Sequence, residues 1–375
     1  MIKVMSIFGT RPEAIKMAPL VKELESRKEI KSIVCVTAQH RQMLDQVLET
    51  FDIVPDYDLN IMKQGQSLSD ITLHALKNLS EVIKEVQPDL VLVHGDTTTT
   101  FAGALAAFYN QVAIGHVEAG LRTYDKYSPF PEEMNRQMVD CMADLYFAPT
   151  QLSKQNLIKQ NIDTKKIFVT GNTAIDSMKT TINPSYKNKI FDWIGNDRMI
   201  LLTAHRRENL GDPMRHIFKA IRRIVDEFDD VKVVYPIHLN PKVREVAKEI
   251  FKGCDKVKII EPLEVFDFHN FQNKSYIILS DSGGIQEEAP SLGKPVLVLR
   301  DTTERPEGIE AGTLKLVGTQ EDIIYNETKK LLTDKKIYNK MSKASNPYGD
   351  GHTSERIADI IINQYAEKVN STESN

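Results

Sequence analysis

Carboxylates that could carry out acid/base chemistry stand directly after apolar runs of the sequence. Asp96 and Glu118 each follow such a run, and Glu132 follows a Pro-rich segment. A carboxyl at the end of a buried strand is expected to be half-buried, which raises its pKa and suits proton transfer. Asp96 could instead be a turn residue before a Thr-capped helix. We assign Glu133 to the electrostatics of a helix's first turn, so Glu133→Gln should be mild.

The turn Ser282-Gly283-Gly284 offers a second kind of chemistry, the binding of an anion. It separates two apolar runs and opens a short helix. Two glycines let the backbone approach a ligand closely, and the first helical turn presents unpaired N–H groups at the positive end of the helix dipole. We interpret this turn as a phosphate seat, and an ordinary helix start satisfied by water is the alternative.

Basic side chains stand near the ends of the same apolar runs. Arginine suits bidentate contact with phosphate, although each of these residues could also be surface charge: Arg11, Lys16, His205, Arg206, Arg207 and Arg305. A metal at His94, Asp96 and His116 is the rival use of these polar positions. Both histidines lie inside apolar strands and no known ligand spacing occurs, so no metal is expected. Neither GxGxxG nor GxxxxGK[ST] is present, which argues against an NAD fingerprint and a P-loop.

Short strand-like runs alternate with helical stretches along the whole chain, which predicts α/β domains with parallel sheets. The expected strands are 4–8, 32–37, 90–94, 113–117, 145–148, 167–170, 199–203, 231–237, 257–260, 276–279 and 296–299. Ligands bind outside the carboxyl ends of strands in such sheets, where the polar clusters stand. Because both halves contribute clusters, we expect two Rossmann-like domains around a central cleft, divided between residues 171 and 195.

The composition supports this interpretation. The chain has 375 residues, more than one core usually fills, and 41% of them are hydrophobic and 27% charged. The formal net charge of −4 gives no general attraction for nucleic acid or anionic lipid. Three widely spaced cysteines fit a reducing compartment. No apolar run reaches the ~18 residues of a membrane helix, and no signal peptide is recognised, so we expect a cytoplasmic protein.

Motifs from the whole chain through Gly351 closely resemble the bacterial non-hydrolysing UDP-N-acetylglucosamine 2-epimerases. They are FGTRPEAIKMAPL, TAQHRQMLDQV, VLVHGDTTTT, GHVEAGLRT, SPFPEEMNR, TGNTAID, HRREN, YPIHLNP, DSGGIQEEAPSLGKPVLVLRDTTERPE and NPYGDG. The resemblance implies the glycosyltransferase-B architecture. An N-terminal domain, 1–171, would carry the carboxylates and regulatory cluster, and a C-terminal domain, 172–353, would bind UDP. The last helix, 354–369, would return to the first domain.

The resemblance also implies an activity, the reversible conversion of UDP-GlcNAc into UDP-ManNAc. UDP would leave C1 as C2 loses its proton, giving 2-acetamidoglucal, and would add back after protonation of the other face. No cofactor is implied, and the enzyme would be a homodimer that supplies ManNAc units for cell-surface polysaccharide or teichoic acid. The alternatives are a hydrolysing epimerase that releases free ManNAc, and a glycosyltransferase or nucleotide-sugar binding module of the same fold.

Site residues follow from the resemblance position by position. The catalytic set would be Asp96, Glu118, Glu132 and His205. The substrate contacts would be Arg11, Lys16, Asp96, Glu118, His205, the backbone of Leu263, Phe268, Ser282, Gly283, Gly284, Glu288 as ribose acceptor, and Arg305. A second UDP-GlcNAc would act as an allosteric activator through Gln39, His40, Gln42 and Arg206, by favouring a closed form.

Overall fold

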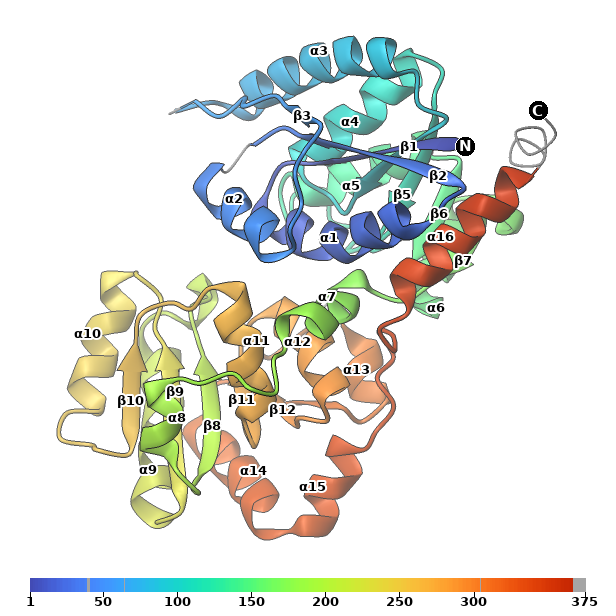
Figure 1. Cartoon of the computed structure of the whole chain (residues 1–375). Helices are drawn as coiled ribbons and strands as arrows, with labels where there is room; N and C mark the ends of the chain where they lie inside the picture. The colour runs from blue at the N-terminus through green and yellow to red at the C-terminus, as the bar shows by residue number, and fades with distance from the viewer. Residues whose placement is uncertain (39–40, 64, 304, 367–375) are drawn as a thin grey trace. The chain divides into compact units, whose positions relative to one another are not determined.

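The computed structural model describes residues 1–38, 41–63, 65–303 and 305–366. The chain forms two compact units, one of Met1–Thr180 with Tyr348–Asn375 and one of Thr181–Pro347. Each unit is built on a parallel β-sheet flanked by helices (Figure 1). The predicted fold class, two α/β domains with parallel sheets, is therefore confirmed.

The sheet of the first unit has seven strands in the order β3-β2-β1-β4-β5-β6-β7, and every neighbouring pair is parallel. This order places β1, β4 and β5 side by side, so that their carboxyl ends share one edge. The strands are β1 (Ile2–Phe8), β2 (Ile30–Val36), β3 (Tyr57–Asp58), β4 (Leu90–His94), β5 (Ala113–Val117), β6 (Leu145–Ala148) and β7 (Ile167–Val169).

Successive residues of β1 point into two different apolar cores because side chains alternate along a strand. Val4 and Phe8 pack with residues of α1, α2 and α16, whereas Met5 and Ile7 pack with residues of α3 and α4. Figure 1 shows these two groups of helices on opposite sides of the sheet. The helices are α1 (Arg11–Ser26), α2 (Arg41–Thr50), α3 (Leu68–Val86), α4 (Thr98–Tyr109), α5 (Glu132–Met142), α6 (Gln151–Lys159), η1 (Thr164–Lys166), α7 (Thr173–Thr181) and α16 (Thr353–Gln364).

The second unit repeats this design with six parallel strands in the order β10-β9-β8-β11-β12-β13. Here β8 and β11 are neighbours, which brings the turns after them together. The strands are β8 (Arg198–Thr203), β9 (Val231–Pro236), β10 (Val257–Ile260), β11 (Ile277–Ser280), β12 (Val296–Val298) and β13 (Leu314–Leu316).

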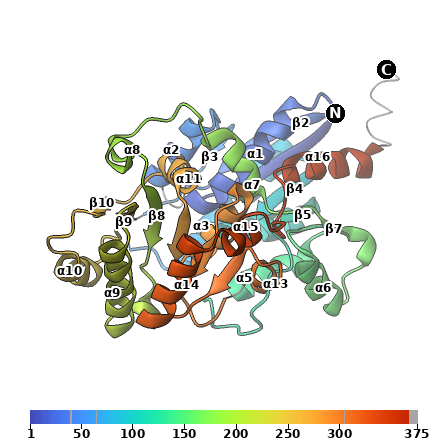
Figure 2. The ribbon, with the colours of Figure 1, turned by 90° about the horizontal axis from the view of Figure 1, so that it is seen from below.

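Two groups of helices cover this second sheet. Ile200 and Leu202 pack toward α9, α10 and α14, whereas Met199 and Leu201 pack toward α8, α11 and α12. Helix α9 lies between α10 and α14 (Figures 1 and 2). The helices are α8 (Lys189–Ile194), η2 (Arg207–Asn209), α9 (Asp212–Glu227), α10 (Pro241–Ile250), α11 (Val265–Lys274), α12 (Gly283–Glu288), η3 (Ala289–Leu292), α13 (Pro306–Glu310), α14 (Glu321–Thr333) and α15 (Lys335–Ser342).

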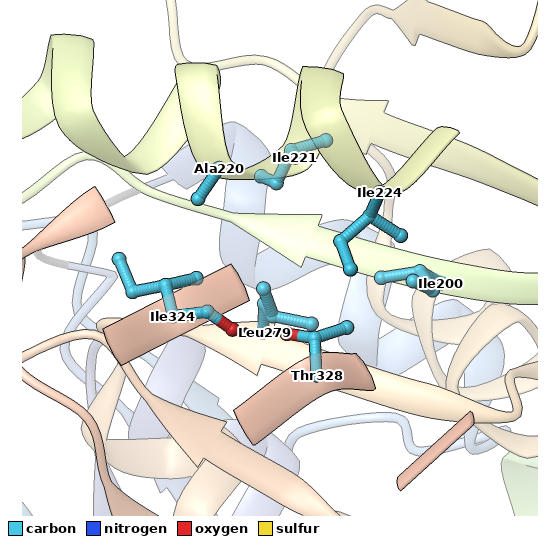
Figure 3. Close-up of a pocket in the computed structure, with 7 residues that line it drawn as sticks. All are labelled: Ile200, Ala220, Ile221, Ile224, Leu279, Ile324 and Thr328. Atoms are coloured by element: carbon cyan, nitrogen blue, oxygen red, sulfur yellow. Dashed lines mark hydrogen bonds between the residues drawn. The ribbon is translucent and has the colours of Figure 1, made fainter. Parts of the chain in front are cut away.

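The contact between α9 and α14 is apolar core and not a ligand site. Figure 3 shows Ile221 and Ile224 of α9 facing Ile324 and Thr328 of α14, above Leu279 of β11. The space among these side chains has no volume for a water-sized molecule. The only hydroxyl in the group, that of Thr328, donates to the Ile324 carbonyl at 2.7 Å.

All the strands predicted from the sequence are present, most within two residues of their expected limits. Two edge strands, β3 and β13, were not predicted, because segments of two and three residues are too short to show an alternating pattern. The predicted last helix appears as α16, which starts at Thr353, and its expected end at residue 369 lies outside the described residues.

The chain crosses from one unit to the other twice, and hydrogen bonds within the first unit join the segments next to the two crossings. The backbone N–H of Asn172 donates to the Tyr348 carbonyl at 2.7 Å, and that of Ser354 donates to Asp176 Oδ1 at 2.7 Å. The contact units divide after Thr180, near the end of α7 and inside the interval of residues 171 to 195 expected from the sequence. The division of functions between domains 1–171 and 172–353 stays a prediction.

Among the residues that the structure describes, no helix is both long enough and apolar enough to cross a membrane.

Candidate active site

The predicted carboxylates of the first unit lie at one edge of its sheet. Strand β4 leads into Asp96, and its neighbour β5 leads into Glu118. On the other side of β4, β1 leads into Thr10, the N-cap of α1, which carries Lys16. Because these strands are adjacent and parallel, their polar carboxyl-terminal turns converge as predicted.

Glu13, which the sequence did not single out, connects two of these turns. Its Oε2 accepts the backbone N–H of Gly9 at 3.1 Å and of Thr10 at 2.8 Å, as in a capping box. Its Oε1 accepts the hydroxyls of Thr97 at 2.7 Å and Thr100 at 3.0 Å, in the turn after β4. Glu13 is 2% exposed. A single buried carboxylate with four donors therefore fixes the start of α1 against the Asp96 turn.

Glu118 is surrounded by groups that favour its ionised form. Its Oε2 pairs with the Lys16 ammonium, lies 3.4 Å from His94 Nε2 and accepts the Asn172 side-chain amide at 3.3 Å. The Glu118 side chain is 10% exposed and that of Lys16 is 16% exposed. The pair is therefore well shielded from water, where its attraction is stronger than at a surface.

This environment reverses the predicted pKa shift of Glu118. Burial alone raises the pKa, as expected, but the adjacent Lys16 and His94 outweigh burial and hold the pKa well below its ordinary value. Glu118 also has a φ of +66°, which is uncommon for a residue other than glycine. Such strained residues cluster at functional sites, and here the backbone turns the carboxylate toward Lys16.

Two side chains of α5 contact Asp96 and fix its position. Its carboxylate pairs with the Arg136 guanidinium, and its backbone carbonyl accepts the Asn135 amide at 2.9 Å. The Asp96 side chain is 26% exposed, so it remains accessible from the sheet edge. Asp96 is also the turn residue before a Thr-capped helix that the alternative describes, because Thr97 is the N-cap of α4. The contacts from Asn135 and Arg136 of α5 are additional to that position.

Glu132 and Glu133 have different environments at the start of α5. Glu132 is half-buried in the first turn. Glu133 is fully buried, accepts the backbone N–H groups of Thr123 at 3.0 Å and Tyr124 at 3.1 Å, and lies 3.3 Å from Arg136. Our assignment of Glu133 to helix electrostatics alone was therefore wrong, because the sequence does not show that the preceding loop at Thr123 and Tyr124 folds back onto it.

The three positions considered for a metal have other partners. His94 approaches Glu118, Asp96 pairs with Arg136, and His116 lies between the Asp140 carboxylate and the Gly95 carbonyl. Within residues 1–38, 41–63, 65–303 and 305–366, no three His, Cys, Asp or Glu side chains gather as metal ligands would.

In the second unit, Asp281 organises the turn after β8, and the sequence analysis missed it. This fully buried carboxylate follows β11, and its Oδ2 accepts the backbone N–H groups of His205 and Arg206, both at 2.8 Å, and the Asn209 amide at 3.0 Å. The strand order supplies the reason, because β8 and β11 are neighbours. Asp281 therefore fixes two of the predicted residues, His205 and Arg206.

His205 lies at the surface of this turn with its ring stacked on His238, the centroids being 5.6 Å apart. Burial lowers the pKa of His205; the Asp281 carboxylate opposes this shift, and His238 and Arg206 add to it. The ring is therefore neutral over a wider pH range than a free imidazole. His205 is suited to accept or donate a hydrogen bond at neutral pH.

The predicted phosphate seat is covered by an arginine. Ser282 is the N-cap of α12, and a Cβ placed on Gly283 would lie 2.6 Å from Arg305 Nη1. The Arg305 guanidinium thus packs against the Gly283 backbone, and a side chain at position 283 would displace it. Its Nε donates to the buried Glu287 carboxylate at 2.7 Å, which fixes its orientation.

The remaining predicted residues of the second unit lie on or near the helices that flank this seat. Glu288 ends α12, and its Oε2 accepts the Gln272 amide at 2.9 Å and lies 3.6 Å from His269 Nε2. Phe268 of α11 and Leu263, which precedes α11, are half-buried against the same apolar cluster. Some of the predicted residues therefore contact one another or a shared partner within a unit: Lys16 pairs with Glu118, His205 and Arg206 share Asp281, and Arg305 packs on Gly283.

The predicted regulatory cluster is described only in part. Gln39 and His40 lie outside the described residues, and Gln42 lies in α2, where the structure describes the backbone. Arg206 is placed in the second unit, where its Nε donates to the Asp281 carbonyl at 3.2 Å.

Known proteins match this chain along nearly its whole length. The sequence profile of UDP-N-acetylglucosamine 2-epimerases matches residues 22–362. A UDP-N-acetylglucosamine 2-epimerase from Bacillus subtilis is 65% identical over 373 residues, which cover 100% of this chain and 98% of that protein.

Solved structures give the same result for the fold. A crystal structure from Listeria monocytogenes is 58% identical, has a TM-score of 0.94 and covers 98% of this chain and 97% of its own. The UDP-GlcNAc 2-epimerase of Neisseria meningitidis, solved with UDP-GlcNAc bound, is 49% identical, has a TM-score of 0.86 and covers 96% of this chain and 100% of its own. The chain therefore belongs to the UDP-N-acetylglucosamine 2-epimerase family.

Proposed function

We propose that the protein interconverts UDP-GlcNAc and UDP-ManNAc by eliminating UDP and adding it back, without hydrolysis. Family membership supports epimerisation at C2, and a relative that is 49% identical binds UDP-GlcNAc. The observation that carries the mechanism is the Glu118 site, a shielded carboxylate kept ionised beside a lysine at the end of β5.

The chemistry requires help from the leaving group. The C2 proton of the sugar has no adjacent carbonyl to acidify it, so its removal alone has too high a barrier. In the elimination, a carboxylate takes the C2 proton, the C2–H electrons form the C1=C2 bond, and the C1–O bond breaks to give UDP. Reversal with protonation on the opposite face of C2 gives the epimer. Stabilising the departing diphosphate should be the largest catalytic contribution.

Roles for the first unit follow from the states of its carboxylates. Glu118 is the proposed base in one direction, because its pKa is held low and the ionised form is present at neutral pH. Asp96 and Glu132 complete the proposed acid/base group, with Arg136 holding Asp96. A diphosphate that attracted Lys16 would weaken its pairing with Glu118 and make the carboxylate a stronger base.

Roles for the second unit follow from its anion seat. Ser282, Gly283 and Gly284 are proposed to bind the diphosphate, with Arg305 as bidentate donor. Glu288 would accept the ribose hydroxyls, an orientation supported by Gln272. Phe268 and the backbone of Leu263 would contact the uracil, and Arg11 and His205 would contact the diphosphate and sugar. The proposal requires that one substrate molecule engages residues of both units.

One experiment separates this function from its alternatives. UDP-GlcNAc is incubated with the protein in D2O, and the anomeric signals are followed by NMR. We expect deuterium at C2 of UDP-GlcNAc and UDP-ManNAc with the sugar still attached to UDP. Release of free ManNAc would instead identify a hydrolysing epimerase. The absence of any exchange would favour a glycosyltransferase or a nucleotide-sugar binding module.

Regulation by a second UDP-GlcNAc is part of the proposal. Gln39, His40 and Gln42 with Arg206 would bind it and favour the active conformation. Initial rates from pure UDP-ManNAc should then be low and rise when traces of UDP-GlcNAc are added. Hyperbolic kinetics without a lag, unchanged by Gln42→Ala, would contradict this regulation. The homodimer, the supply of ManNAc units to cell-surface polysaccharide or teichoic acid, and the cytoplasmic location stay predictions.

A further inference from the structure

A buried histidine lies in β5, next to the turns that carry Asp96 and Glu118. His116 of β5 is fully buried, with Nδ1 2.6 Å from Asp140 Oδ1 and Nε2 2.8 Å from the Gly95 carbonyl oxygen. A carbonyl only accepts hydrogen bonds, and so does an ionised carboxylate. Both ring nitrogens therefore face oxygen acceptors, Nδ1 the carboxylate and Nε2 the carbonyl.

The carboxylate partner is ionised for a physical reason. Asp140 of α5 is 1% exposed. Burial raises the pKa of Asp140, but His116 and then Arg122 outweigh burial and leave the pKa below its ordinary value. Arg122 Nη2 donates to Asp140 Oδ2 at 2.5 Å and to Gln160 Oε1 at 2.5 Å. The group is thus a buried cluster in which the Asp140 carboxylate contacts both His116 and Arg122.

This cluster touches the backbone of both carboxylate turns. Gly95, which His116 contacts, immediately precedes Asp96 and has a φ of +68°. On the other side, the Gly120 N–H donates to Asp140 Oδ2 at 3.3 Å, two residues after Glu118. One hydrogen-bonded pair therefore spans the turns that present the two proposed acid/base groups.

Stability alone does not explain such a cluster. Burying charges costs desolvation, and replacing a buried ion pair with apolar residues is often neutral or stabilising. A fixed arrangement of directional hydrogen bonds is what a charged cluster supplies and an apolar core does not. Acid/base catalysis needs such control, because the donor and acceptor must lie within hydrogen-bonding reach of the substrate proton.

We propose that His116 and Asp140 are positioning residues that hold the Asp96 and Glu118 turns in register for the reaction. The proposal rests on the proposed function, which makes these two carboxylates catalytic. It predicts that loss of the pair lowers kcat while the affinity for UDP, assigned to the second unit, is unchanged. A misplacement of about 1 Å in a catalytic group costs about 10²-fold in rate.

The test compares Asp140→Asn and Asp140→Glu with Tyr146→Phe in the full-length protein. The Tyr146 hydroxyl lies 2.7 Å from both the Asp140 and the Ala143 carbonyl oxygens, and so Tyr146 belongs to the same core without joining the turns. We expect Asp140→Asn to lower kcat about 10²-fold, Asp140→Glu to restore part of it, and Tyr146→Phe to lower only the unfolding midpoint. The dissociation constant of UDP, measured by calorimetry, should be the same in all three.

NMR of the histidine-labelled wild-type protein keeps the inference testable if Asp140→Asn does not fold. A hydrogen-bonded ring N–H signal of His116 that exchanges slowly with solvent is expected, assigned through contacts with neighbouring β-strand protons. Absence of any such signal would overturn the inference, as would a folded Asp140→Asn variant with the wild-type kcat. Absence of C2 exchange by the wild-type protein would overturn the proposed function as well, so the two failures are distinguishable.

Discussion

Replacing Lys16 with methionine isolates the electrostatics of the Glu118 site. Met keeps the length and apolar stem of the side chain but removes the ammonium that pairs with Glu118. Removing one partner of a buried pair typically costs about 3–5 kcal/mol. Because Asn172 and His94 still contact the carboxylate, at 3.3 and 3.4 Å, we expect the lower end, about 3 kcal/mol at neutral pH.

The direction of the Glu118 pKa shift determines how the effect of Lys16→Met on stability changes with pH. In the wild type the folded pKa of Glu118 lies below the ordinary value of 4.5. The pair therefore stabilises the fold above that value, and the stabilisation is lost as the pH falls through the folded pKa. In Lys16→Met, burial raises the folded pKa instead, so the variant gains stability relative to the wild type on acidification. The difference between the two proteins should shrink toward about pH 4.

Thermal unfolding at neutral pH and about pH 4 measures this difference, and 3 kcal/mol corresponds to roughly 6–12 °C in Tm for a domain of this size. Lys22→Met is the matched control, because Lys22 lies on the same helix in an exposed pair with Glu25 at 3.0 Å and should change stability by less than about 1 kcal/mol. In a Glu118→Gln background, Lys16→Met should cost little. An effect as small as that of Lys22→Met, or one independent of pH, would refute the electrostatic account.

Three further substitutions test other parts of the site. Gly283→Ala should displace the Arg305 guanidinium, because the new Cβ would lie 2.6 Å from Nη1, and calorimetry should show UDP affinity weakened about tenfold or more. Glu13→Gln places an amide donor among four donors and should lower the free energy of unfolding by about 1–3 kcal/mol. Urea titration measures this change, and an unchanged unfolding midpoint would exclude the role of Glu13 in connecting the two turns. His205→Asn should reduce kcat. It should also reduce the loss of stability on acidification below the ordinary histidine pKa of 6.5, because the wild-type ring has a lowered pKa and resists protonation when folded; parallel stability curves for the two proteins would contradict this.

The fold was predictable because most of its strands are short apolar runs, and central strands such as β4, β11 and β12 are buried on both faces. Strands β4, β5, β6 and β10 were predicted to the residue, and the polar segments that follow the parallel strands lie at one edge of each sheet. The edge strands β3 and β13 were missed because pairing with a neighbour, and not a sequence pattern, defines segments of two and three residues.

The site was less predictable because its electrostatics depend on residues distant in sequence. The pKa of Glu118 was predicted with the wrong sign, since Lys16, from α1, reaches it only through the β1-β4-β5 order. Asp281 and Glu133 have roles that depend on which backbone N–H groups fold onto them. A polar residue in a sequence shows its chemical type, and only the fold shows the partner that sets its charge and direction.

Cleavage of the C1–O bond is the central claim, and positional isotope exchange tests it most directly. UDP-GlcNAc is prepared with ¹⁸O in the oxygen that bridges C1 and the β-phosphorus, and is incubated with the protein until the epimers equilibrate. Elimination frees UDP, whose terminal phosphate oxygens become equivalent by rotation before UDP adds back. We predict that ¹⁸O appears in non-bridging positions, detected through ³¹P isotope shifts, at a rate comparable to epimerisation. Epimerisation with all the label retained in the bridge would contradict the account.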